Sequence, residues 1–95
     1  MKSEKLSIAK QKAYLAQYLR DLKTRTPCVD CGINYPYYVM DFDHVRGQKH
    51  ANVMELVSTL SKKKIDEEIA KCEIVCSNCH RIRTHMRRMA KIAKK

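Results

Sequence analysis

The beginning of the chain has the hydrophobic pattern of one long helix. Apolar residues recur at helical spacing within residues 4–23, at Leu6, Ala9, Ala13, Leu15, Tyr18, Leu19 and Leu22. This period places them along one face of a helix, and Ser3 is a candidate N-cap. Pro27 disfavours helical backbone at Thr26, which precedes it. We therefore predict an N-terminal helix within residues 1–25.

Two short strands are predicted further along the chain. The segment 37–42 is rich in aromatic and β-branched side chains, which favour strands. Alternation along this strand places the carboxylates Asp41 and Asp43 on the same face. The second strand, residues 73–75, is short and leads directly into Cys76.

Helical patterns fill the rest of the chain. Residues 51–60 carry apolar side chains at helical spacing, with Asn52 as a candidate cap. Residues 65–71 open on three acidic residues, which suit the positive N-terminal end of a helix. From Cys79 or His80 onward the helical pattern returns, with apolar positions at Ile82, Met86, Met89 and Ile92. Helices and strands together predict an α+β fold.

Chain length limits how this fold is stabilised. A chain of 95 residues forms one small domain with little buried apolar area, so a structural metal would help it fold. No apolar run is long enough for a transmembrane helix. The charged residues near the start exclude a signal peptide. We therefore expect the protein to be intracellular and cytoplasmic, either in its own cell or, if phage-encoded, in the host cell. There, paired cysteines more often bind metal than form disulfides.

The five cysteines fit a metal site with one cysteine to spare. Two Cys-x-x-Cys pairs supply four thiolates, the set that suits tetrahedral zinc, at Cys28, Cys31, Cys76 and Cys79. The alternatives are redox-active pairs or buried cysteines. Residues 32–75 separate the pairs, so a small subdomain lies between them. Cys72 is expected to be a small buried side chain.

Charge indicates the partner. The chain has 20 Lys and Arg against 10 Asp and Glu, a net charge of +10, and no acidic residue follows Glu73. Such a distribution favours a polyanion, most simply nucleic acid. The alternative is a charged surface that only keeps the protein soluble.

Three further residues indicate a second centre. Zinc with four sulfur ligands has no open position, so any reaction needs other groups. Asp43 and His44 stand at the end of the first strand, and His80 follows Cys79 directly. A carboxylate and an imidazole can share Mg²⁺, which keeps waters and takes phosphate oxygens as its other ligands. His44 is then free as a general base for attack of water on a phosphodiester.

Each of these residues also has a structural interpretation. An Asp-His pair at the end of a strand is often a surface turn. His80 can cap its helix or contact a carbonyl group. The combination with the zinc pairs and the basic chain favours the catalytic interpretation.

The motifs "CVDC", "DFDH" and "CSNCHRIRTH" together resemble the HNH endonucleases, and they cover residues 28–88. The chain is similar to small phage and bacterial members of that family. The resemblance implies a ββα-metal core, with two antiparallel strands and one helix around a catalytic Mg²⁺ or Mn²⁺, braced by zinc. Residues 51–71 then form a two-helix insertion between the strands, and residues 89–95 a basic tail. The whole chain, residues 1–95, is a single domain.

The resemblance also assigns roles. It implies that Asp43 and His80 bind the catalytic metal and that His44 is the base. Many members of the family carry an asparagine on the second strand, nine positions before the helix histidine. In this chain that position, counted from His80, is Lys71. Asn78 either replaces that asparagine, orienting the loop that carries His44, or only stabilises the zinc turn.

These features lead to one function and its alternatives. We predict a metal-dependent DNA endonuclease that contacts mainly phosphates, through Arg46, Lys49, Arg81, Arg83, His85, Arg87 and Arg88. A non-catalytic zinc module that binds nucleic acid shares the zinc and the charge. A thiol redox protein leaves the charge unexplained. The N-terminal helix either packs on the core or offers a surface for a dimer or another protein.

Overall fold

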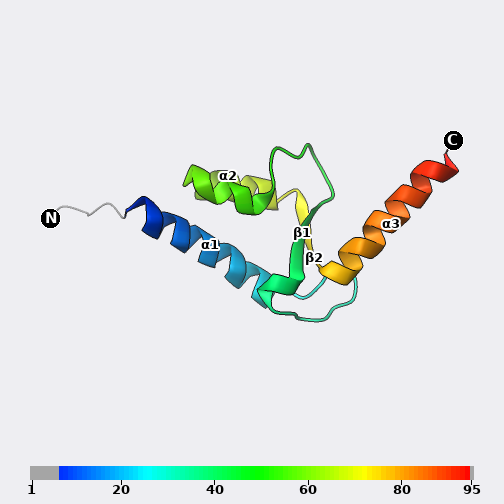
Figure 1. Cartoon of the computed structure of the whole chain (residues 1–95), viewed down its shortest axis with the longest axis horizontal. Coiled ribbons are helices and arrows are strands. Elements are labelled where there is room, and N and C mark those ends of the chain that lie inside the picture. Colours follow the sequence, from blue (N-terminus) through cyan, green and yellow to red (C-terminus); the bar gives the residue numbers. More distant parts are fainter. Residues whose placement is uncertain (1–6, 95) are drawn as a thin grey trace.

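The computed structural model describes residues 7–94 and confirms a mixed α+β fold (Figure 1). Helix α1 spans Ile8–Arg25, and its N-terminus is capped by Ser7, whose hydroxyl accepts from the Lys10 N–H at 3.2 Å. The predicted cap Ser3 lies outside the described residues. The helix begins later than expected because Ser7 supplies the capping oxygen.

The sheet consists of strands β1 (Met40–His44) and β2 (Cys72–Cys76), which pair antiparallel. The first strand was predicted too early. Residues Tyr37–Val39 form a 3₁₀ turn, η1, closed by a hydrogen bond from the Val39 N–H to the Pro36 carbonyl at 3.0 Å. The later start places Asp43 and His44 on the strand itself, where Asp43 pairs with Glu73.

The segment between the strands is helical, with boundaries that differ from the prediction. Residues Val53–Thr59 form the 3₁₀ helix η2, and α2 spans Lys62–Ile69. The start of α2 was predicted at residue 65, but the Ser61 hydroxyl accepts from the Lys64 N–H and caps the helix earlier. The three acidic residues therefore lie beyond the first turn, and Glu68 faces the interior.

Two groups of buried side chains hold the molecule together. The first group surrounds the sheet, and we call this part of the molecule the cysteine half. Its central side chains are Cys28, Met40, Ile74, Val75 and Cys76. The second group joins α1, η2 and α2, and we call this part the helical half. Its buried side chains are Leu15, Leu19, Val53 and Ile65. Phe42 on β1 packs against both groups. The N-terminal helix thus packs on the core through Leu15 and Leu19, one of the two roles expected for it.

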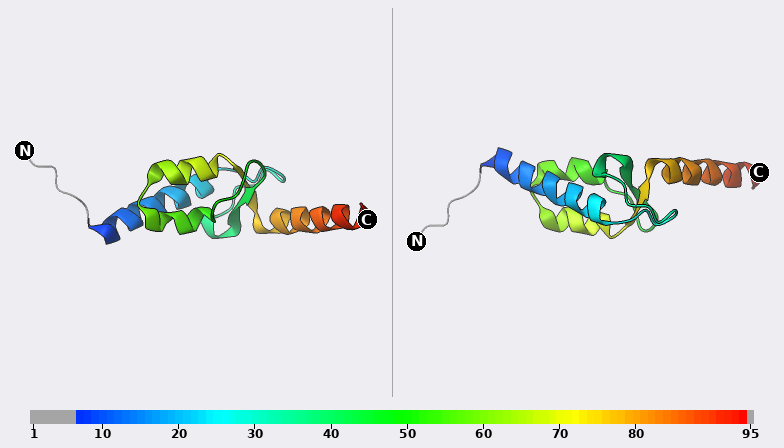
Figure 2. Two further views of the ribbon diagram at one scale, coloured as in Figure 1. Left: turned by 90° about the horizontal axis from the view of Figure 1, so that it is seen from above. Right: turned by 90° about the horizontal axis from the view of Figure 1, so that it is seen from below.

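Helix α3, Ser77–Ala93, begins at the end of β2 and projects away from α1 and α2 (Figure 2). It starts before Cys79 because the Cys76 sulfur accepts from the Cys79 N–H at 3.4 Å and caps it. Within residues 77–93 no side chain is buried, and Ile82 and Met86 are 60% and 61% exposed. Among residues 7–94, no helix is both long and apolar enough to cross a membrane.

Candidate metal centre and candidate active site

The first Cys-x-x-Cys pair lies in a tight turn after α1. The Gly32 N–H donates to the Cys28 carbonyl at 2.8 Å, and the Cys28 N–H donates to the Ile33 carbonyl at 3.0 Å. Gly32 has a φ of 74°, a left-handed conformation that favours glycine. The turn directs Cys28 and Cys31 toward the second pair, Cys76 at the end of β2 and Cys79 in the first turn of α3.

The sulfur atoms of the two pairs meet, as predicted. The ligand atoms of Cys28, Cys31, Cys76 and Cys79 all lie within 4.8 Å of one another. The Cys31 and Cys76 Sγ atoms are 4.0 Å apart. Four sulfurs at about 2.3 Å from one zinc lie about 3.8 Å from each other. The cluster can therefore hold a metal ion such as zinc.

The ionisation of these thiols also fits a cation. Burial raises the pKa of Cys28, but backbone N–H groups, first that of Cys31, lower it more, to about 6. The Cys76 sulfur and burial raise the pKa of Cys79 to about 12. Close thiols resist ionising together unless a positive ion offsets their charge. Cys72 lies apart and is half-buried, and burial raises its pKa to about 11.

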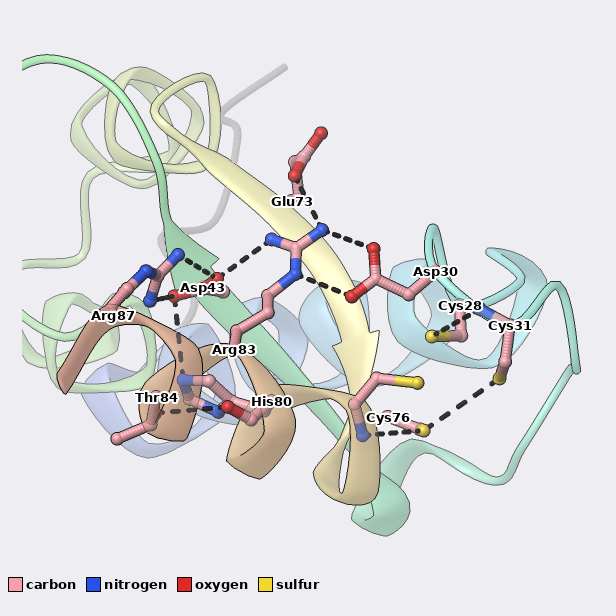
Figure 3. A network of polar contacts seen from close by, with 11 residues as sticks. Cys28, Asp30, Cys31, Asp43, Glu73, Cys76, His80, Arg83, Thr84 and Arg87 are labelled. Carbon is pink, nitrogen blue, oxygen red and sulfur yellow. Dashed lines mark hydrogen bonds and ion pairs between the residues drawn. The ribbon is translucent and has the colours of Figure 1, made fainter. Parts of the chain in front are cut away.

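A second group of polar residues forms where α3 crosses β1. Asp43 is 4% exposed, and its Oδ1 lies 3.5 Å from Nε2 of His80. The other imidazole nitrogen, Nδ1, is 2.9 Å from Oδ2 of Asp41. The shared strand face of the two carboxylates, expected from alternation, thus meets the first turn of α3. Figure 3 shows His80 and Asp43 facing each other.

Two arginines of α3 also bind Asp43. Arg83 donates to Asp43 Oδ2 at 2.9 Å, and Arg87 donates to both carboxylate oxygens, at 3.0 and 2.8 Å. Burial raises the pKa of Asp43, but the Arg87 and Arg83 guanidinium groups lower it more, so it stays ionised. Arg83 also forms a two-point contact with Asp30, between the first pair of cysteines, and an ion pair with Glu73 (Figure 3).

His44 contacts a residue that the sequence did not single out for the site. Its Nε2 lies 2.8 Å from Oε2 of Glu68, a side chain on α2 that is 3% exposed. The same oxygen accepts from the His50 N–H at 3.1 Å, and Lys71 pairs with the other oxygen at 3.0 Å. The sequence showed Glu68 only as one of three acidic residues near a helix start. Its burial depends on how α2 packs.

A cleft lies beside these groups. Its volume is about 270 Å³, and Asp41, His44 and His80 all line it. A larger groove of about 550 Å³ runs beside it along α3, lined by Arg81, His85 and Arg88, among others. His44 and His80, from different elements, therefore reach one surface depression.

The other predicted site residues lie in different surroundings. Asn78 is exposed and makes no side-chain hydrogen bond to any residue in the range 7–94. Arg46 donates to the Ala70 carbonyl at 2.7 Å, which ties it to the end of α2. Lys49 is exposed, as are Arg81, His85 and Arg88 on α3.

Comparison with known proteins found no match to this chain. No family model matches it, and no curated protein or solved structure matches it either.

Proposed function

We propose that this protein is a metal-dependent endonuclease that hydrolyses phosphodiester bonds in DNA, with an HNH-type centre on a ββα-metal core. The observation that carries the proposal is the placement of Asp43 Oδ1 3.5 Å from His80 Nε2, beside a cleft that His44 also lines. A carboxylate, an imidazole and a nearby second imidazole are the groups that metal-assisted hydrolysis needs.

The residues present suit a divalent cation. Asp43 is ionised and buried, and His80 offers a ring nitrogen toward it. Mg²⁺ and similar hard ions often bind through one or two protein groups and complete their shell with water and phosphate oxygens. A bound Mg²⁺ or Mn²⁺ supplies Lewis-acid stabilisation of charge on the phosphate and on the leaving oxygen.

The chain's own groups divide the remaining work. His44 accepts a proton from the attacking water. Asp43 and His80 hold their positions through the sheet and through the first turn of α3. Zinc at the four cysteines would fix the start of α3, and with it the direction of His80. The metal in the cysteine cluster would thus be structural, and that at Asp43 catalytic.

Exposed cations provide the DNA surface. Arg81 and Arg88 line the groove that adjoins the cleft, and Lys49 is also exposed. A net charge of +10 supports affinity through phosphate contacts that weaken with salt. Arg83 and Arg87 were predicted to bind DNA, and their contacts with Asp43 give them a second role in holding that carboxylate.

One observation favours a second candidate, a zinc module that binds nucleic acid without cutting it. Arg83 and Arg87 together donate three hydrogen bonds to Asp43, so both oxygens of this buried carboxylate have partners without a metal. On this alternative Asp43 only anchors α3 to the sheet.

Cleavage of supercoiled plasmid decides between the two. We expect the zinc-loaded protein to nick plasmid with Mg²⁺ or Mn²⁺, and His44→Ala to slow cleavage by about 10²- to 10⁴-fold, the usual contribution of a general base. His50→Ala is the matched control, because His50 is an exposed histidine that lines neither the cleft nor the groove and keeps its backbone N–H in the variant, and it should retain activity. DNA binding without cleavage under every divalent metal would leave the second candidate.

A further inference from the structure

We propose that Glu68 is the positioning residue of the base His44, so that the segment between the strands, rather than Asn78, orients the base. This inference rests on the proposed function. Glu68 belongs to α2, far from the Asp-His pair in sequence, and its carboxylate meets Nε2 of His44 at 2.8 Å.

The Glu68 side chain is held from several directions. It is 3% exposed, and the His50 N–H, the Lys71 ammonium and the His44 ring all contact its oxygens. Burial raises the pKa of Glu68, but hydrogen bonds from Lys71, the His50 N–H and His44 outweigh this effect. The net result is a pKa lowered to about 2. The carboxylate is therefore ionised at neutral pH and can only accept hydrogen bonds.

This acceptor determines the tautomer of His44. A neutral imidazole carries one N–H and one lone pair, and a contact made by one nitrogen sets the state of the other. Glu68 requires the proton on Nε2, because a carboxylate cannot donate. Nδ1 then carries the lone pair that accepts a proton from water. The imidazolium formed in that step keeps its Nε2–H on Glu68, which stabilises the new charge.

Asn78 lacks the contacts for this role. It lies at the start of α3, exposed, and its side chain makes no hydrogen bond within residues 7–94. Glu68 reaches its position because the neighbouring turn of α2 is anchored by Ile65, which is fully buried against α1 and η2. The segment between the strands therefore places the Glu68 carboxylate in contact with the base, His44.

Glu68→Gln tests the assignment, with Glu67→Gln as its matched control. Glu67 is the exposed neighbour on the same helix, so both variants lose one negative charge. We expect Glu68→Gln to lower kcat about 10- to 100-fold, the scale on which outer partners of site histidines act. KM, DNA affinity and zinc content should stay unchanged. Glu67→Gln should match the wild type. Equal kcat values for the two variants overturn the inference.

A double variant separates positioning from a general structural effect. If Glu68 acts through His44, Glu68→Gln should cause no further loss of kcat when combined with His44→Ala. An undiminished effect in that background shows that Glu68 acts elsewhere, and overturns the inference.

The tautomer of His44 can be measured on the wild-type protein. This test remains decisive even if Glu68→Gln fails to fold. Nitrogen-15 NMR above neutral pH should show His44 protonated at Nε2 and not at Nδ1. The opposite tautomer contradicts the inference but not the proposed function, which depends on cleavage and its loss in His44→Ala. Absence of cleavage by the wild-type protein overturns both.

Discussion

The cysteine half and the helical half of the molecule each hold one of the two histidines that line the cleft, by different physical means. In the cysteine half, a cluster that can hold a metal stands at the start of α3, and His80 follows it. In the helical half, aliphatic packing of α1, η2 and α2 places Glu68 behind His44. The cleft lies where both halves meet β1. Damage to one half should therefore affect the site differently from damage to the other half.

Loss of the metal should have the largest effect, because it removes the centre of the cysteine half. We expect Cys76→Ser to lose zinc and its cooperative thermal transition, since zinc contributes roughly 10 kcal/mol or more to folding of small zinc domains. Cys72→Ser should keep one zinc, because Cys72 lies outside the cluster. Metal analysis and circular dichroism measure both. Wild-type zinc content and melting in Cys76→Ser would contradict the role of the cluster.

Leu19→Ala should weaken the helical half and leave the metal in place. Leu19 is 0% exposed, so its truncation should cost about 2–5 kcal/mol of unfolding free energy. Tyr14→Ala, on the exposed face of the same helix, should change it by less than about 0.5 kcal/mol. Urea denaturation gives these values. Equal stability of the two variants would show that α1 does not support the core.

Asp43→Asn lies at the boundary of the halves and should have an intermediate effect. Loss of the Asp43 charge should cost about 1–3 kcal/mol, because the carboxylate and its bond from Arg83 are buried, while the bonds from the half-exposed Arg87 contribute less. It should also abolish cleavage. Asp30→Asn is the control, since Asp30 shares Arg83 but not His80. Full activity in Asp43→Asn would remove it from the proposed metal site.

Single cations of the groove should have the smallest effect. We expect Arg88→Ala to weaken DNA binding similarly on all sequences and to reduce the salt slope of log K by about 1. Lys12→Ala, an exposed cation on α1, should leave the slope unchanged. Fluorescence anisotropy across a salt series measures this. An effect of Lys12→Ala equal to that of Arg88→Ala would place the DNA elsewhere.

The two halves also differ in how far the sequence alone predicted them. The cysteine cluster was predicted fully, because each pair is local and zinc chemistry defines the spacing. The approach of Asp43 to His80 followed from strand alternation and the position after Cys79. Glu68 was missed, because its burial depends on the packing of α2 rather than on local pattern. Helix starts shifted where Ser7 and Ser61 supply the caps.

The most direct test of the central claim, that the two halves assemble one metal-dependent centre, is anomalous diffraction from crystals of His44→Ala with duplex DNA and Mn²⁺. This variant keeps the proposed ligands and should cut about 10²- to 10⁴-fold more slowly, which preserves the DNA during crystallisation. The account predicts a manganese peak between Asp43 Oδ1 and His80 Nε2, beside a DNA phosphate. A structure with DNA bound, no peak there, and Arg83 and Arg87 still on Asp43 would contradict it.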